Sequence, residues 1–448
     1  MRIILKSGLV LMLLEAVPAQ AATTVTNIAA GIGHSLFVKS DGSLWVMGNN
    51  DVGQLGDGTS NNTNRPEQIV SSGVIAISAG ASHSLFLKSN GSFWVMGWNQ
   101  DGQLGLGPSL YSTNNPQQIV PSGVIAISAG GYHSLFLKSD GSLWGMGREG
   151  DGQLGDGTFV NTVTTPEQIV PSGVTAIAAG EYHSLFLKAD GSLWAMGFNN
   201  SGQLGDGTYT KTNRPQQIVS SGVISMAAGF NHSMFLKSDG SLWVMGNNGF
   251  GQLGFGKYGS GTNRPVQLLA SGVVSVAAGG NTSLFLKSGG SFWSMGLNEY
   301  GKYGDGRWSN TNQPVQLVDS GVVALARAEV FGLFIKSDGS LWAMGDDVSG
   351  ELGDGFTTSI PSVPEQIVPS PQPMLASSIS FGTNIQFQAT TPFGGTFYLL
   401  ASTDLSKPFS QWTRVWTNSV SARGTNFSAT ISNAISSGGG QFYILQAQ

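Results

Sequence analysis

Five histidines occupy the same position in a recurring sequence unit, and histidine is a side chain often used for proton transfer or metal binding. They are His34, His83, His133, His183 and His232, and two further copies of the unit carry Thr282 and Phe331 there. Such a column could form a metal or general-base site, or each imidazole could hydrogen-bond the backbone inside its own unit. If neighbouring units pack as sheets about 10 Å apart, equivalent histidines are too far apart to share a metal, whose bonds are about 2 Å long. We therefore expect a structural role for the histidines and no metal site.

Other arrangements typical of catalysis are missing from the sequence. There is no cysteine, which excludes thiol catalysis and disulfides. The glycine-rich loops lack the Gly-Lys-Ser/Thr of a phosphate cradle, and the stretch from Asp151 to Gly157 lacks the twelve-residue ligand order of a calcium loop. No Ser-His-Asp order or paired-carboxylate constellation stands outside the repeated columns. We expect no catalytic residue, no cofactor and no enzymatic activity.

The unit that carries the histidines recurs seven times. Its tryptophan falls at Trp45, Trp94, Trp144, Trp194, Trp243, Trp293 and Trp342, a period of about 50 residues typical of solenoids and propellers. In the third copy, strands are predicted at Val124–Ala129, His133–Lys138, Leu143–Met146 and Pro166–Val170, with an Asp140-Gly141 turn between the second and third. Four short strands per repeat are typical of a propeller blade. The second strand is apolar on both faces, which fits a sheet packed between two neighbours.

The motifs A-G-x-x-H-S-L-F-L-K, S-D-G-S-L-W and G-Q-L-G-D-G recur in fixed order. In these motifs the chain resembles the regulator of chromosome condensation repeat family, over about residues 25–370. The loops of the last two copies depart from the pattern, with Gly301-Lys-Tyr-Gly304 and Gly350-Glu-Leu-Gly353. The resemblance implies an all-β, seven-bladed β-propeller of a secreted bacterial type. It does not by itself imply an activity.

Sequence variation among the seven copies concentrates in two connections of each blade. If the strands run up and down, the connection between strands one and two lies on the same face as the long loop between strands three and four. The other two connections are nearly constant and lie below. Aromatic residues, which favour binding surfaces, gather in the variable connections, and we predict a partner-binding site there. Its residues are Trp98, Tyr132, Phe159, Tyr182, Phe198, Tyr209, Phe230, Tyr258 and Trp308. The same rings could instead pack over the loops and cap the blades.

Residues 1–21 have the features of a signal peptide. Arg2 and Lys6 precede a short apolar run, and Ala19-Gln20-Ala21 fits a cleavage site. We therefore expect a secreted, periplasmic or cell-surface protein without a membrane span, and a monomer. The repeat predicts a propeller at residues 22–370. Residues 371–448 follow a proline-rich linker and predict a small β-sandwich, in which Trp412 and Trp416 form part of the core or a sugar-binding platform.

Three functions are compatible with these features. The net charge of −5 excludes a nucleic-acid binder that neutralises phosphates. The leading hypothesis is a scaffold that binds a protein or a cell-surface polysaccharide through its variable face. The resemblance implies one specific form of this hypothesis, an enzyme inhibitor, since the family includes a secreted bacterial inhibitor of β-lactamases. A second hypothesis, also from the resemblance, is guanine-nucleotide exchange on a small GTPase. The third is a polysaccharide-active enzyme with a site in the central channel.

Overall fold

The computed structural model describes residues 23–357 and 361–370 and, in the C-terminal region, six strands between residues 376 and 447. The chain divides into two compact units, of which Val25–Val368 is one. The predicted signal peptide lies outside the described residues, so it stays a prediction.

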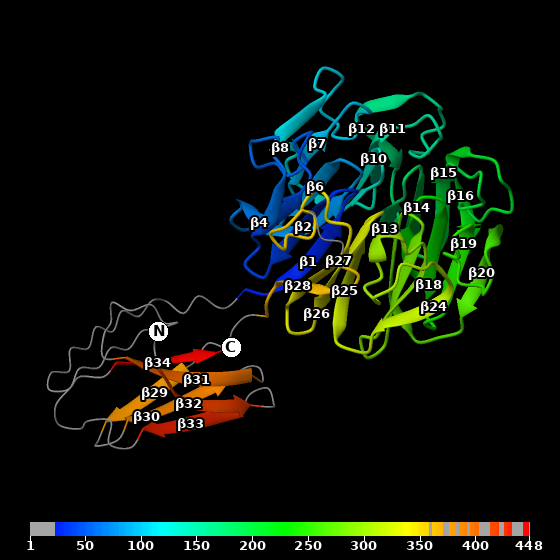
Figure 1. Cartoon of the computed structure of the whole chain (residues 1–448). Coiled ribbons are helices and arrows are strands. Elements are labelled where there is room, and N and C mark those ends of the chain that lie inside the picture. Colours follow the sequence, from blue (N-terminus) through cyan, green and yellow to red (C-terminus); the bar gives the residue numbers. More distant parts are fainter. Residues whose placement is uncertain are drawn as a thin grey trace. The chain divides into compact units, whose positions relative to one another are not determined.

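The unit Val25–Val368 is a β-propeller with seven four-stranded antiparallel sheets, which follow one another around a ring in chain order (Figure 1). Each blade consists of four consecutive strands, so no strand is exchanged between blades. This confirms the predicted seven-bladed architecture.

The first strand of every blade lies at the central channel. These strands are β1 (Val25–Ala30), β5 (Val74–Ala79), β9 (Val124–Ala129), β13 (Val174–Ala179), β17 (Val223–Ala228), β21 (Val273–Gly279) and β25 (Val322–Arg327). The second strands are buried almost throughout: β2 (His34–Lys39), β6 (His83–Lys88), β10 (His133–Lys138), β14 (His183–Lys188), β18 (His232–Lys237), β22 (Thr282–Lys287) and β26 (Phe331–Lys336). Their burial on both faces confirms the prediction from their continuous apolar sequence.

The third strands carry the repeated tryptophans: β3 (Leu44–Gly48), β7 (Phe93–Trp98), β11 (Leu143–Arg148), β15 (Leu193–Gly197), β19 (Leu242–Asn248), β23 (Phe292–Gly296) and β27 (Leu341–Gly345). The fourth strands close each sheet: β4 (Thr63–Val70), β8 (Ser112–Val120), β12 (Thr162–Val170), β16 (Thr212–Val219), β20 (Gly259–Leu269), β24 (Thr311–Val318) and β28 (Glu365–Val368). A single turn of 3-10 helix, η1 (Glu299–Gly301), lies in the long loop of blade 6.

The fourth strand of blade 3 begins at Thr162, four residues before the predicted start at Pro166. The pairing register shifts between Gly145 and Gly147, whose partners are Glu167 and Val163. The proline therefore falls at an irregularity of the ladder, where its missing N–H breaks no regular pairing. Strands can thus continue past a proline that the sequence alone places at their beginning.

The hydrophobic core is divided among the seven junctions between neighbouring blades. At the junction of blades 3 and 4, for example, Leu135 and Leu137 of β10 pack with Phe186 of β14 and Met196 of β15. The junction of blades 7 and 1 has the same form, with Leu333 and Ile335 in the cluster of Phe37. Each blade therefore buries its apolar faces only against its two neighbours.

The long loop of each blade docks onto the next blade, and this contact also closes the ring. Gly157 N donates to Asn213 O of blade 4 at 2.8 Å, and Gly355 N of blade 7 donates to Asn64 O of blade 1 at 2.8 Å. Close approach requires glycine in the loop. At Gly152, with φ 82°, an added Cβ would lie 2.7 Å from the Asn213 Cα.

Six strands form the C-terminal region. They are β29 (Ala376–Phe381), β30 (Ile385–Thr391), β31 (Gly395–Ser402), β32 (Thr413–Val420), β33 (Thr425–Ile431) and β34 (Phe442–Ala447). They pair as two three-stranded sheets, in the orders β29-β30-β33 and β32-β31-β34. The apolar segments 385–389, 396–400 and 442–445 lie within β30, β31 and β34. The β-sandwich itself stays a prediction, as does the role of Trp412, outside the described residues, and of Trp416.

Candidate binding face

The antiparallel order within each blade places the two variable connections at the same end of the sheet. In blade 3 the β9–β10 connection and the β11–β12 loop meet there, since Ser134 pairs with Ala129 on one side and with Met146 on the other. We call this end of the propeller the upper face. The nearly constant Asp-Gly turns lie at the opposite end, the lower face.

Four of the predicted aromatic residues form one continuous cluster on the upper face, across blades 2, 3 and 4. The Tyr132 and Tyr182 rings stack at 5.5 Å between centroids with an interplanar angle of 18°. Trp98 meets Tyr132 edge-on at 6.3 Å, and Phe198 meets Tyr182 edge-on at 6.2 Å. All four side chains are half-buried. We refer to Trp98, Tyr132, Tyr182 and Phe198 as the aromatic ladder.

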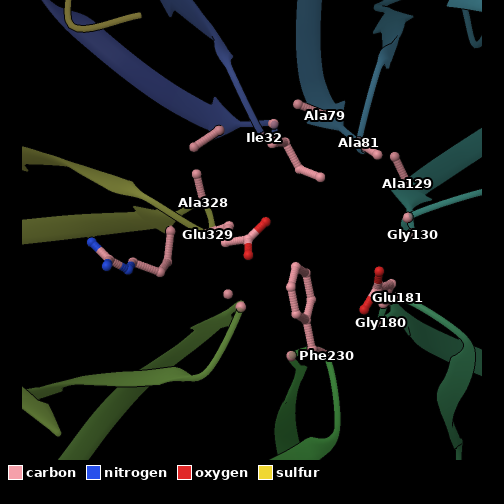
Figure 2. Close-up of a pocket in the computed structure, with 18 of the residues that line it drawn as sticks. Ile32, Ala79, Ala81, Ala129, Gly130, Gly180, Glu181, Phe230, Ala328 and Glu329 are labelled. Atoms are coloured by element: carbon pink, nitrogen blue, oxygen red, sulfur yellow. The ribbon is translucent and has the colours of Figure 1, made fainter. Parts of the chain in front are cut away.

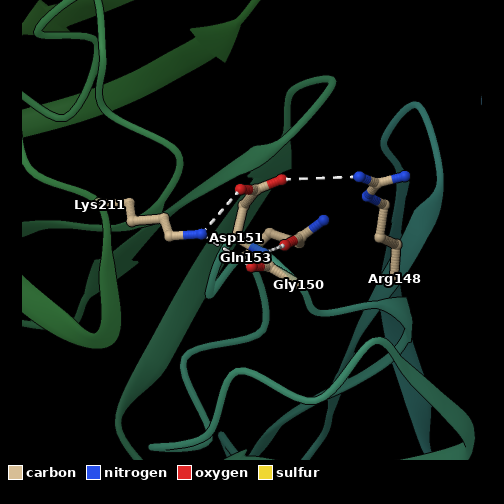
Figure 3. A network of polar contacts seen from close by, with 5 residues as sticks. All are labelled: Arg148, Gly150, Asp151, Gln153 and Lys211. Carbon is tan, nitrogen blue, oxygen red and sulfur yellow. Dashed lines mark hydrogen bonds and ion pairs between the residues drawn. The ribbon is translucent and has the colours of Figure 1, made fainter.

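Arg148 joins the ladder to a polar network between blades 3 and 4. Its Cζ lies 5.3 Å from the Tyr182 ring centroid and 6.0 Å from that of Tyr132, within cation–π range. Its Nη2 lies 3.9 Å from Asp151 Oδ2, and Asp151 Oδ1 lies 3.2 Å from Lys211 Nζ (Figure 3). Lys211 also donates to Gly150 O at 3.0 Å. These exposed ion pairs contribute little stability, but they align the loops beside the ladder.

The outer predicted residues do not join the ladder. Phe159, Tyr209, Tyr258 and Trp308 lie in the long loops of blades 3 to 6 and are each about half exposed, between 48% and 56%. Lys211 Nζ lies 5.1 Å from the Phe159 ring centroid, and Tyr258 Oη donates to Asn310 O at 3.0 Å. The predicted set therefore divides into a packed ladder and separate rings on the rim.

Phe230 lies at the channel mouth, in a cavity of about 90 Å³ lined by the ends of the seven first strands. Figure 2 shows its ring between the carboxylates of Glu329 and Glu181. Burial, with the nearby Glu329 carboxylate, raises the pKa of Glu181 to about 7, against the lowering effects of Tyr182 and Arg148. The ladder and the channel mouth are thus electrostatically coupled through Glu181 and Tyr182.

The channel mouth is held by backbone hydrogen bonds from blade to blade. Gly131 N donates to Gly180 O at 3.1 Å, and Phe230 N donates to Gly280 O at 3.0 Å. An added Cβ at Gly31 would lie 2.6 Å from Gly80 O of the next blade, which explains a glycine at this position. The side chains at the mouth therefore project from a rigid ring.

Five charged residues that lie beside the ladder or at the channel mouth were not predicted: Arg148, Asp151, Lys211, Glu181 and Glu329. Arg148, Glu181 and Glu329 stand in the same variable columns as the selected aromatic residues, so variation among the repeats already marks them. They were omitted because the predicted site was built from aromatic side chains alone. Tyr111, 72% exposed in the long loop of blade 2, was also missed because it stands outside those columns.

The histidine column forms bonds between blades rather than within them, which corrects the predicted intrablade contact. His83 Nε2 lies 3.0 Å from Ser134 Oγ, and His183 Nε2 lies 2.8 Å from Ser233 Oγ. Burial lowers the pKa of all five imidazoles, to about 3 or 4, so they are neutral at ordinary pH. Among the described residues, no three His, Asp or Glu side chains gather in a way that could hold a metal ion.

Seven four-stranded blades built from a repeat of about 50 residues define the chain as a repeat β-propeller. The model of the RCC1-like domain matches residues 112–398, more than half of the chain, and models of the regulator of chromosome condensation (RCC1) repeat match residues 41–87, 25–54 and 74–103. The chain therefore belongs to the RCC1-like propeller family. No match was found among curated protein sequences.

Solved structures of low sequence identity share the fold. Human WBSCR16 is 22% identical, with a TM-score of 0.65 over 74% of this chain and 96% of that one. Prp20p from Saccharomyces cerevisiae is 21% identical, with a TM-score of 0.66 over 80% of this chain and 90% of that one. That yeast protein has binding properties to Gsp1p and histones. The same yeast protein bound to Kap60 gives a TM-score of 0.64 at 21% identity, over 80% of this chain and 86% of that one.

In the part of the chain that the structure describes, no helix is long and apolar enough to cross a membrane.

Proposed function

We propose that this chain is a non-catalytic binding module that recognises a protein partner through the upper face of its propeller. The observation that carries the proposal is the aromatic ladder, in which four rings from three blades contact one another beside the channel mouth. Solvent-accessible tyrosine and tryptophan are the residues that dominate binding energy at protein interfaces. Because these rings are already held by each other, a partner would order few side chains on binding.

The channel mouth supplies the charge that complements the ladder. Glu181 and Glu329 face a cavity that also contains the Phe230 ring, and its lining includes one cationic residue, the buried Arg327 (Figure 2). A lysine or arginine side chain of the partner would offset the repulsion between the carboxylates and stack on the ring. This favours a protein with an exposed basic residue over a neutral polysaccharide. The protein partners named for the yeast relative agree with this choice.

The location of the protein is part of the proposal. With residues 1–21 acting as an export signal, the mature chain would meet its partner in the periplasm, at the cell surface or outside the cell. Residues 371–448 would then form a β-sandwich whose role is separate from the upper face. An extracellular enzyme blocked by the upper face would be one such partner, and guanine-nucleotide exchange stays an alternative prediction from the family.

The experiment uses the full chain as bait for proteins of the culture medium, with protease-treated medium as the control for polysaccharide. The affinity of the captured binder is then measured for the wild type, for Tyr132→Ala/Tyr182→Ala and for Ile125→Ser/Ile224→Ser. The two isoleucines are matched controls, because they are 55% and 59% exposed and are the second residues of β9 and β17, at the lower face. Loss of binding in the tyrosine variant alone supports the proposal, whereas loss in the isoleucine variant alone assigns binding to the lower face.

A further inference from the structure

Blade 3 differs from the other blades at one buried position of its long loop. Blade 7 has Asp347 at this position, and the other five blades have asparagine. The asparagines are Asn50, Asn99, Asn199, Asn248 and Asn298. Blade 3 has Glu149, whose side chain is fully buried. A glutamate here exchanges a neutral amide for a carboxylate in the interior of a loop, which is costly without a compensating positive charge.

Glu149 keeps half of the role of the asparagine. In blade 4, Leu204 N donates to Asn199 Oδ1 at 3.0 Å, and in blade 3 Leu154 N donates to Glu149 Oε2 at 2.5 Å. One carboxylate oxygen therefore replaces the amide oxygen. The loop remains closed around its leucine, as in the other blades.

Glu149 cannot replace the hydrogen bonds that the asparagine Nδ2 donates, because an ionised carboxylate has no donor. Asn199 Nδ2 faces oxygens of its own loop: Asp206 Oδ1 at 3.1 Å, Thr208 O at 3.3 Å and Thr210 O at 3.2 Å. In blade 2, Asn99 Nδ2 likewise donates to Leu110 O at 2.7 Å. The amide nitrogen of the asparagine is thus surrounded by oxygen acceptors of its own loop.

Blade 3 retains the hydrogen bonds that position these oxygen acceptors in the other blades. Thr158 N donates to Asp156 Oδ1 at 2.6 Å, as Thr208 N does to Asp206 Oδ1 at 2.8 Å. Glu149 N donates to Asn161 O at 3.0 Å, the counterpart of the bond from Asn99 N to Tyr111 O at 2.7 Å. By this correspondence, Val160 O takes the place of Leu110 O.

By the correspondence with Asn199, the second oxygen of Glu149 takes the place of the amide nitrogen. Glu149 Oε1 is buried and has no hydrogen-bond partner among the described residues.

We propose that Glu149 and Asp156 bind a divalent cation of the calcium type inside the long loop of blade 3. Calcium takes oxygen ligands from carboxylates and backbone carbonyls in flexible geometry, whereas magnesium demands regular octahedral geometry and retains its waters. The two carboxylates balance a charge of two, and loop carbonyls equivalent to those around Asn199 Nδ2 supply further ligands. This site has two acidic side chains, so it differs from the clusters of three His, Asp or Glu side chains that are absent among the described residues.

The bound cation would also stabilise the loop that carries part of the binding face. Glu149 follows Arg148 directly, and Asp151 lies two residues further on, so the loop that holds the cation also holds the network beside the aromatic ladder. The cation site does not depend on the proposed partner, so each can be tested without the other.

The test is calorimetric titration of the chelator-treated full chain with calcium chloride near pH 8. We expect calcium binding by the wild type, loss of one site or at least a tenfold loss of its affinity in Glu149→Asn, and one additional site in Asn199→Glu. Glu149→Asn restores the residue of five other blades, so the fold should be retained, and Asp156→Asn is a second loss-of-site variant. Magnesium should bind more weakly than calcium.

Two results would overturn the proposal. One is the absence of calcium binding by the folded wild type, which would mean that Glu149 holds a proton instead. The other is equal calcium affinity and stoichiometry in the wild type, Glu149→Asn and Asp156→Asn, which would place any bound calcium elsewhere.

Discussion

The imidazole Nε2 of His133 in blade 3 lies 2.8 Å from the Oγ of Ser184 in blade 4. The same hydroxyl donates to Gln153 O of the blade 3 loop at 2.7 Å. The serine thus ties both a strand and a loop of one blade to the next. The relation recurs at every junction that begins with a histidine, from His34 to His232.

Replacing one of these histidines should weaken the propeller. We expect His133→Ala to lower the free energy of unfolding by about 2–4 kcal/mol, because it removes a buried hydrogen bond and leaves a cavity. Urea unfolding followed by tryptophan fluorescence measures the change. His133→Phe is the informative control, since phenylalanine occupies the same column at Phe331. A change within 0.5 kcal/mol for the alanine variant, on the order of a typical surface substitution, would contradict a structural role.

The buried histidines also predict acid sensitivity. Their folded-state pKa values of about 3 or 4 lie below the ordinary value of 6.5. The unfolded chain therefore binds protons first, and stability should fall as the pH decreases from about 6.5 towards 4. Melting temperatures across this range test the prediction. The loss should be smaller in His133→Phe, and an identical pH profile in that variant would contradict it.

The Glu181 carboxylate predicts the opposite trend. The pKa of Glu181 is raised to about 7, so its ionisation destabilises the fold as the pH rises from about 4.5 to 7. Glu181→Gln should therefore be more stable than the wild type at pH 8, by about 1–2 kcal/mol because partial exposure screens the effect, and nearly equal at pH 4. Chemical unfolding at both values measures the difference. A variant less stable than the wild type at pH 8 would show that the carboxylate is stabilised instead.

Each blade has a lysine over its tryptophan on the lower side. Lys138 Nζ lies 4.0 Å from the Trp144 ring centroid, and the other six blades repeat the pair. Lys138→Met keeps the apolar stem and removes the charge, so we expect a loss of about 0.5–1 kcal/mol in urea unfolding. A stabilised variant would mean that burying the charge outweighs the ring contact.

The junction of blades 6 and 7 replaces the serine bond with a different pair. Arg327 Nη1 donates to Lys302 O at 2.9 Å, and Gly332 stands where the other blades have serine. A Cβ at Gly332 would lie 2.9 Å from Arg327 Nη1. We expect Gly332→Ser to destabilise by about 1–3 kcal/mol, and Arg327→Ala/Gly332→Ser to recover much of this loss. A double-mutant cycle measures the coupling, and additive effects would contradict it.

The repeat made the propeller predictable from sequence. Seven copies with a fixed order of strands determine the architecture, and the buried second strand is visible in the run from Leu135 to Leu137. The partner of each histidine was not predictable, because Ser184 lies 51 residues from His133 and only the stacking of blades brings them together. The lysine–tryptophan contact was missed for a related reason, since it depends on the pairing of two neighbouring strands.

The candidate site was predictable only in outline. Variation among the repeats selected the upper face, but it could not show that Tyr132 and Tyr182 stack while Tyr209 and Trp308 stand apart on the rim. Tyr132 and Tyr182 lie in the short connections after the first strands, where neighbouring blades contact each other, whereas Tyr209 and Trp308 lie in the outer parts of the long loops. Glu181 and Glu329 were overlooked because their proximity follows from the closed ring and not from their spacing.

The most direct test of the proposed function is the affinity of the full chain for its captured protein partner, compared between the wild type and Tyr132→Ala/Tyr182→Ala. The ladder predicts at least a hundredfold weaker binding in the tyrosine variant, since each buried interface ring contributes about 2 kcal/mol or more. Ile125→Ser/Ile224→Ser should bind like the wild type. Unchanged affinity in a folded tyrosine variant would contradict the assignment of the upper-face ladder as the binding site.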